Sequence, residues 1–398
     1  MHGPTCSKDV VGRAAHRAAA AIGALTLAAA AALSPPAGRC EGLTLPESGD
    51  NQRAVASQWI GPVEVSITYH SPRVISPTGE DRHGKIWGGL VPYGYTSGQG
   101  FGTCGDKCPW RGGANENTVF TTSHAVRIEG QPLPAGSYGL HFLPGREEWT
   151  IIFSQNHSSW GSFFYDQRED ALRVQVKAVP HPFNQWLAYE FPERAPDHAT
   201  AQLAWEDLAV PFRIAVDDVD SIYLAAIREE LRGMSGFRNE NWVLAAQFCL
   251  VHKVDYAEGL SWAQQAVSSP SFGLEDFNNL ILLAGLLDAN GRAAEAEQAR
   301  QKAYYHQTAT AIVLHGYARG KLARGEKEGA IEVFFLNAKR FPNQWPVHAG
   351  LMRAYSAQGK YKEALAEARL ALAQAPDDLN RKALAVMIEK LQAGKDVN

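Results

Sequence analysis

The 398-residue sequence lacks the motifs that most often identify an enzyme or a nucleic-acid-binding protein. It contains no phosphate-binding P-loop, no Gly-x-Ser-x-Gly nucleophile turn and no His-Glu-x-x-His zinc motif, so it gives no evidence for those three kinds of chemistry. Its histidines are scattered singly, and we expect neither a metal nor a cofactor. No block of lysines and arginines is present and the formal net charge is −4, which argues against nucleic acid as a partner.

One glycine pattern needs a separate decision. Gly100, Gly102 and Gly105 have the spacing of a dinucleotide-binding fingerprint, but Asp106–Pro109 follows instead of a helix. Because that fingerprint works by opening a helix, we reject it here.

The N-terminal segment, 1–34, differs in composition from the rest of the chain. Lys8, Arg13 and Arg17 precede an Ala/Leu-rich run, residues 18–33, which Ser34-Pro35-Pro36 ends. A basic start, a short apolar core and small residues behind it predict a secretory signal peptide. The run would span roughly 24 Å as a helix, short for a bilayer crossing. A retained N-terminal anchor is the alternative.

The cleavage site stays open between Ala30-Ala31-Ala32 and Cys40-Glu41-Gly42. We expect an exported protein, periplasmic or extracellular, with no stable membrane span after cleavage. A flexible linker is predicted over residues 35–58.

Export permits disulfide bonds. Cys104 and Cys108 bracket Gly105-Asp106-Lys107, a short turn that would let the two cysteines close a small loop. Free thiols or half of a zinc site are the alternatives, although no second cysteine pair lies nearby. We predict a disulfide. Cys249 lies in an apolar stretch and is expected to be buried and inert.

Residues 59–216 show a period of two. Val63, Val65 and Ile67 alternate with polar residues, and similar short runs recur as far as Val216, separated by Gly, Pro, Asn and Asp. Many short strands without intervening helical pattern predict an antiparallel β-sandwich. Two of the expected strands are 202–205 and 210–216.

Beyond residue 216 the pattern becomes helical and repeats. Gly291, Gly325 and Gly359 recur at one constant interval (325 − 291 = 34), and the alanines 296, 330 and 364 keep the same step. This is the period of the tetratricopeptide helix–turn–helix unit, which stacks into an α-solenoid with a concave binding face.

The expected architecture is therefore an α+β two-domain protein, with an N-terminal antiparallel β-sandwich and a C-terminal α-solenoid. Its helical part is divided into a linking helix over 217–238, tetratricopeptide repeats over 239–378, and a capping helix and tail over 379–398.

The β region also carries an ordered set of motifs. They are Lys85–Gly94 (KIWGGLVPYG), Trp110–Thr118 (WRGGANENT), Leu133–Leu140 (LPAGSYGL), Glu148–Phe153 (EWTIIF) and Leu172–Val176 (LRVQV). This set resembles the bacterial family called domain of unknown function 2911. The resemblance implies a sandwich fold and an exported protein, and it brings no established activity.

The sequence departs from that family at one place. Tyr95–Pro109 intervenes between two of the motifs and carries four glycines with Cys104 and Cys108. It is either a tolerated surface insertion or a loop that modifies a binding surface.

Trp110, Arg111, Asn115 and Glu116 are the candidate ligand-binding residues of the β region. Arg offers a planar fork of donors, Asn both donors and an acceptor, and Glu a carboxylate. Together they would hold a carboxylate, a sugar or the backbone of a guest strand. The alternative is an internal network in which Arg111 pairs with Glu116, Asn115 caps a turn and Trp110 fills the core.

A second candidate set lies on the first helices of the repeat units, which line the groove of such solenoids. These polar residues would grip a peptide backbone or carboxylate, unless they form a solvated helix face. The set is Asn278, Asn279, His315, His348 and Arg353.

From these observations we expect an exported, non-catalytic scaffold or binding protein. It would dock a protein or peptide partner of the cell envelope through the repeat groove and self-associate through the sandwich. The alternative is a glycan- or small-ligand-binding protein, or a hydrolase, acting at the β-sandwich.

Overall fold

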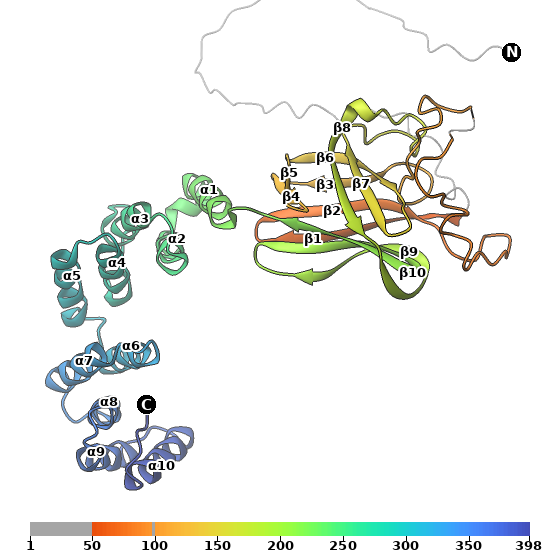
Figure 1. The fold of residues 1–398 in the computed structure, drawn as a ribbon. Helices are drawn as coiled ribbons and strands as arrows, with labels where there is room; N and C mark the ends of the chain where they lie inside the picture. The colour runs from red at the N-terminus through yellow and green to blue at the C-terminus, as the bar shows by residue number, and fades with distance from the viewer. Residues whose placement is uncertain (1–49, 98–99) are drawn as a thin grey trace, which may run out of the picture. The chain divides into compact units, whose positions relative to one another are not determined.

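The protein is described from a computed structural model that covers residues 50–97 and 100–398. The predicted signal peptide, with its cleavage site, lies outside the described residues. Two antiparallel sheets come first in the chain and ten α-helices follow within the described part, which confirms the predicted two-part fold (Figure 1).

The strands form two sheets. The first sheet has the order β1-β2-β3-β6-β7-β8 and the second has the order β5-β4-β10-β9. Strand bounds are β1 Gln52–Ile60, β2 Val63–Ser71, β3 Thr118–Thr122, β4 Val126–Ile128, β5 Gln131–Leu133, β6 Gly136–Leu143, β7 Glu148–Ser154, β8 Asp170–Lys177, β9 Val179–Arg194 and β10 His198–Ala215. A short 3-10 turn, η2 (Gln167–Glu169), precedes β8.

The inner faces of the two sheets share one apolar core. Val63, Val65 and Ile67 of β2 are fully buried, as their alternation predicts. Phe153 of β7 meets Phe212 of β10 with ring centroids 6.1 Å apart, which joins the first sheet to the second. Packing of this kind defines a β-sandwich.

Strand β1 lies mostly inside the segment predicted as a flexible linker. It pairs with β2 from Gln52↔Ser71 to Ile60↔Val63. Its outward face carries Val55 and Trp59, each more than half exposed, while small alanines face inward. The larger apolar side chains of β1 thus point outward and the small ones inward. This is the reverse of the usual half-buried strand pattern, so the strand was not predicted from the sequence.

The two strands expected at 202–205 and 210–216 are one strand, β10. Glu206 has a φ of 56° and marks a shift of register with β9, so the polar interruption is a bulge within a continuous strand.

The helical part consists mainly of helices of similar length. Its elements are α1 Val219–Arg232, η3 Met234–Phe237, α2 Asn239–His252, α3 Tyr256–Ser268, α4 Phe277–Ala289, α5 Ala293–Tyr305, α6 Ala311–Ala323, α7 Lys327–Arg340, α8 Trp345–Ala357, α9 Tyr361–Ala373 and α10 Asp378–Gln392. Within the described residues, none of these helices combines the length and the apolar character needed to cross a bilayer.

The constant glycine spacing has a direct structural cause. Gly291, Gly325 and Gly359 follow the ends of α4, α6 and α8 with φ between 73° and 81°, the left-handed geometry that ends a helix. The alanines of the second series, 296, 330 and 364, are fully buried on α5, α7 and α9. The pairs α4–α5, α6–α7 and α8–α9 thus each have a glycine turn, whereas Lys253 takes the left-handed position between α2 and α3.

Candidate functional site

Three of the four candidate residues of the β region lie around one cleft of the sandwich. Trp110, Arg111 and Asn115 line a cleft of about 400 Å³ together with Arg82 and Trp205. We call it the tryptophan–arginine cleft. Glu116 does not line it; its carboxylate instead lies 3.2 Å from Nδ1 of His70.

The loop that carries these residues is held firmly by backbone contacts. Trp110 exchanges two backbone hydrogen bonds with Phe142 of β6, at 2.8 and 2.7 Å. Gly112 has a φ of 61°, and a Cβ there would lie 2.5 Å from both the Phe142 ring and the Tyr189 hydroxyl. That hydroxyl donates to the Gly112 carbonyl at 2.8 Å. The glycine is therefore required by close packing as well as by its backbone conformation.

Arg111 is placed by three contacts. Its guanidinium lies over the ring of Phe163, 5.1 Å from the centroid, and donates through Nη1 to the Asn115 carbonyl. It also passes directly over Gly161, where a Cβ would overlap it. Burial lowers the pKa of Arg111, and the charge of Glu116 opposes that effect. The alternative prediction, in which Arg111 pairs directly with Glu116, is not met, because the described residues show no ion pair between them. Glu116 acts on Arg111 only through its charge.

Four tryptophans pack together, and two of them, Trp110 and Trp205, line the cleft. Trp110 and Trp205 lie nearly parallel, with centroids 6.3 Å apart and planes 14° apart, and Trp87 meets both edge-on at 5.8 and 5.7 Å. Trp149 packs beneath them, 1% exposed. The indole Nε1 atoms of Trp87 and Trp205 are buried and have no hydrogen-bond partner within the described part of the chain.

The insertion between the family motifs contacts the support of Arg111. Cys104 and Cys108 form the predicted disulfide, with Cα atoms 5.1 Å apart, and Thr96 pairs with Cys108 at the base of the loop. The backbone N–H groups of Thr103 and Cys104 donate to the carbonyl of Phe163 at 2.8 and 3.1 Å. The loop therefore packs against the residue on which Arg111 stacks.

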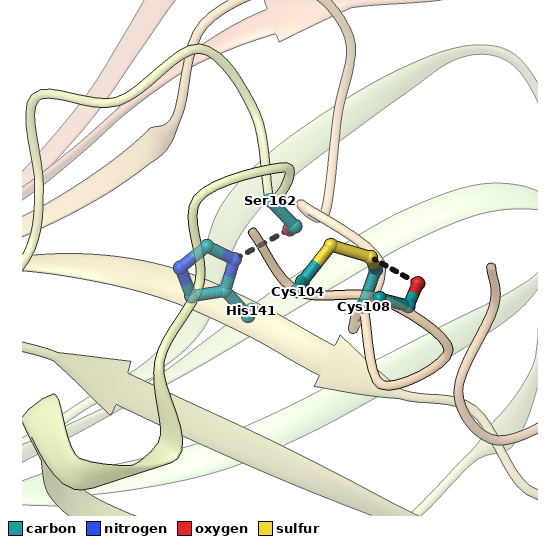
Figure 2. The surroundings of a disulfide bond; sticks show 5 residues. Cys104, Cys108, His141 and Ser162 are labelled. Atoms are coloured by element: carbon teal, nitrogen blue, oxygen red, sulfur yellow. Dashed lines mark hydrogen bonds between the residues drawn. A yellow bond between two sulfur atoms is a disulfide. The ribbon is translucent and has the colours of Figure 1, made fainter. Parts of the chain in front are cut away.

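A buried polar pair lies next to this disulfide. Figure 2 shows His141 of β6 hydrogen-bonded to the Ser162 hydroxyl beside Cys104 and Cys108, and the Nδ1–Oγ distance is 2.7 Å. Burial, reinforced by the positive charge of Arg111, lowers the pKa of His141 to about 3. His141 is therefore neutral at physiological pH.

The candidate residues of the repeats have separate surroundings. Asn279, His315 and His348 are buried, at 4%, 5% and 7% exposure. Asn279 bonds to Asn239 and to the Leu274 carbonyl, and His348 lies 2.7 Å from Glu367. Asn278 is exposed on α4. The three buried side chains thus contact other elements of the stack. The sequence period places them together with Asn278 on a groove-lining face and does not show that they are buried.

Arg353 contacts the end of the chain. It donates to the Val397 carbonyl at 3.3 Å and receives the Asn398 side-chain amide on its own carbonyl at 3.0 Å. One turn further along α8, the Ser356 hydroxyl donates to Asp396 at 2.6 Å and accepts the Val397 N–H at 3.1 Å. The described tail, 394–398, is therefore held on the first helix of a repeat unit.

Four residues of these two candidate sites, two in the cleft and two in the repeats, were not predicted from the sequence. Arg82 and Trp205 reach the tryptophan–arginine cleft from segments that only the fold brings together. Ser356, which binds the tail, belongs to no sequence motif that would have identified it. Arg319 did carry a sequence signal, because it occupies the same repeat position as Arg353, one full period earlier (353 − 319 = 34).

Comparisons with known proteins extend to the β region. Residues 51–214 match a family described as "Protein of unknown function (DUF2911)", in agreement with the motifs of the sequence. No curated protein matches the chain. Among solved structures, a similar chain is that of "Human IFIT1 dimer with m7Gppp-AAAA", at 17% identity and a TM-score of 0.25. The match covers 45% of each chain, and so low a score supports no conclusion on fold or function. The tetratricopeptide assignment remains a prediction, whereas the match of residues 51–214 is to a family whose description assigns no activity.

Proposed function

We propose that this chain is an exported binding protein that docks an acidic segment of a partner polypeptide on the first helices of its tetratricopeptide-type repeats. The observation that carries the proposal is the tail contact on α8. There Arg353 and Ser356 hold a carboxylate, a backbone N–H and a backbone carbonyl of residues 396–398. Any extended polypeptide presents the backbone N–H and carbonyl, and an acidic one also presents the carboxylate, here that of the Asp396 side chain.

The neighbouring first helix, α6, offers an accessible continuation of that surface. Ile312, Gly316 and Arg319 follow each other at helical spacing on one face of α6. Ile312 is 53% exposed, Arg319 is exposed, and a Cβ at Gly316 would meet nothing within 4 Å. A segment with alternating acidic and apolar residues suits this combination.

Electrostatics favours an acidic guest. Burial and the nearby positive charge of Arg319 lower the pKa of Arg353 to about 10, while Asp396 acts in the opposite direction. The two arginines therefore repel each other, and a carboxylate between them relieves that repulsion.

Export is supported by the basic and apolar start of the sequence and by the Cys104–Cys108 pair, since disulfides persist in oxidising compartments. The partner is then a component of the same compartment.

The test uses a labelled peptide of alternating aspartate and valine, and the same peptide with asparagine for aspartate, added to the full chain. We expect the acidic peptide alone to bind, and Arg319→Ala to weaken it about tenfold or more, as for a lost hydrogen bond to a charged group. Arg369→Ala, an exposed arginine on α9, is the matched control.

A further variant addresses the tail. Asp396→Asn loosens residues 396–398 from Ser356 and should strengthen peptide binding if both use the same surface. Equal binding of the two peptides, or equal losses in Arg319→Ala and Arg369→Ala, would refute the proposed docking.

A further inference from the structure

The tryptophan–arginine cleft supports an inference that goes beyond peptide docking. We propose that this cleft of the β-sandwich binds a small organic carboxylate that has an apolar body. Its charge, its aromatic lining and the unpartnered indole donor of Trp205 each contribute a separate argument.

The charge of the cleft is positive. Arg82 and Arg111 line it, and no aspartate or glutamate does so among the described lining residues. Arg82 donates Nε to the Val74 carbonyl at 3.3 Å and Nη2 to the Arg73 carbonyl at 3.1 Å, so neutral groups hold it in position. Its Nη1 has no partner within the described residues. Arg111 uses only Nη1 in its hydrogen bond to Asn115. Both guanidinium groups thus retain donors, and their planar shape matches a carboxylate.

The remaining lining is apolar and aromatic. Trp110 and Trp205 present their nearly parallel indoles, and Leu90, 50% exposed, lies with Pro72 and Pro77 around the same cleft. A volume of about 400 Å³ falls within the range of roughly 300–1,000 Å³ found for small-molecule pockets. An aromatic or short aliphatic body fits this lining, whereas a polypeptide needs an open groove.

The indole of Trp205 gives independent evidence for a ligand. Trp205 is 1% exposed and lines the cleft, yet its Nε1 has no acceptor within the described part of the chain. Buried N–H donors are nearly always paired in folded proteins. Because Nε1 is closed to water, an oxygen of a bound carboxylate would supply the missing acceptor only when the side chains that cover Nε1 move aside on binding. The Nε1 of Trp87 is also buried without an acceptor in the described part of the chain, but Trp87 does not line the cleft.

A neutral sugar matches the cleft less well. Aromatic faces suit sugars, but the two arginines meet no carboxylate among the described residues of the cleft lining. Glu116 acts on Arg111 only from outside the lining, so a bound anion is the group that would neutralise the charge inside the cleft. An inorganic anion would meet the arginines but leave the indoles, Leu90 and the two prolines without a partner. The combination favours a carboxylate joined to an apolar body.

The first experiment uses the full chain without substitution. Binding of 3-phenylpropionate, its uncharged amide, glucose and inorganic phosphate is measured by calorimetry and by tryptophan fluorescence. We expect saturable binding of 3-phenylpropionate with a fluorescence change, and at least tenfold weaker binding of the other three. Equal binding of acid and amide would overturn the proposal. So would tighter glucose or phosphate binding, or the absence of saturable binding by 3-phenylpropionate at millimolar concentration.

Variants then locate the site. Arg82→Gln and Arg111→Gln should each weaken 3-phenylpropionate binding about tenfold, while Arg146→Gln should leave it unchanged. Arg146 is a suitable control because it is exposed and lies over Tyr93, outside the cleft lining. Because Arg111 is packed against Phe163 and Gly161, the Arg111→Gln variant is used only if its thermal unfolding matches that of the unsubstituted protein. The comparison of acid with amide needs no variant. Equal affinities in all three variants would contradict the assignment.

Discussion

The position of Arg111 depends on a residue that has no side chain. Gly161 has a φ of 58° and lies directly against the guanidinium, which is also stacked on Phe163. Two separate requirements thus meet at Gly161: a left-handed backbone and space for the arginine. The two requirements can be separated by comparing Gly161 with a glycine that has a left-handed backbone but no side chain packed against it.

Gly161→Ala should destabilise the sandwich more than Gly130→Ala does. Gly130 also has a positive φ, 80°, but a Cβ there meets nothing within 4 Å. Both changes incur about 1–2 kcal/mol for the left-handed backbone. Gly161→Ala adds roughly 1–3 kcal/mol because Arg111 has to move. Denaturant unfolding followed by tryptophan fluorescence measures the difference, and equal losses in the two variants would show that Arg111 is not held in this way.

At the scale of single elements, the role of the Cys104–Cys108 disulfide in holding its loop against Phe163 can be tested directly. The loop, 95–109, carries this disulfide, and two of its amides donate to Phe163. Replacing both cysteines by serine should speed hydrogen exchange at the amides of residues 103 and 104. The chain-entropy model gives roughly 2 kcal/mol for so short a closed loop. We also expect weaker binding of 3-phenylpropionate, since Phe163 supports Arg111.

Cys249→Ala serves as the control for this loop, because Cys249 is a buried free cysteine on α2. It should leave exchange at residues 103 and 104 unchanged. Unaltered exchange in the double serine variant would instead show that the backbone pairing of Thr96 with Cys108 holds the loop without the disulfide.

One glycine within helix α6 and one just after its end should respond in opposite ways to the same substitution. Gly325 follows the helix with a φ of 81°, so Gly325→Ala should cost about 1 kcal/mol. Gly316 lies within the helix with open space around its Cα, so Gly316→Ala should stabilise by up to about 1 kcal/mol. Thermal unfolding followed by helical circular dichroism gives both signs. A loss at both positions would mean that α6 is packed differently.

At the scale of the whole molecule, periodicity predicts the fold well because each period corresponds to one kind of element. Val63, Val65 and Ile67 predict a strand, and the spacing of Gly291 and Gly325 predicts helix pairs. Strand β1 escapes prediction because its outward face is the more apolar one.

The sites were less predictable, for a physical reason. The motif around Trp110 and Arg111 identifies one wall of the cleft, but Arg82 and Trp205 reach it only through the fold of distant segments. In the repeats, the period gives a residue's position along the helix. It does not say whether His315 packs inward against Phe334 or lines the outer face.

The two parts of the molecule share a dependence on pH that originates in two buried histidines. Burial lowers the pKa of His141 in the sandwich to about 3, and the pKa of His315 in α6 to about 4. An unfolded histidine has a pKa of about 6.5. Below that value the unfolded chain takes up protons that the folded chain refuses, so the free energy of unfolding falls as the pH falls.

Each histidine should therefore remove about 1.4 kcal/mol of stability per pH unit below about 6.5, or about 2 kcal/mol at pH 5. We expect the loss between pH 7 and pH 5 to shrink in the sandwich for His141→Gln and in the helices for His315→Gln. Tryptophan fluorescence follows mainly the sandwich, which holds seven of the ten tryptophans, and helical circular dichroism follows the helices. His157→Gln is the control because His157 is exposed. If neither buried-site variant alters the pH dependence relative to this control, then protonation of His141 and His315 on unfolding does not cause the acid sensitivity, and both side chains remain accessible to protons in the folded chain.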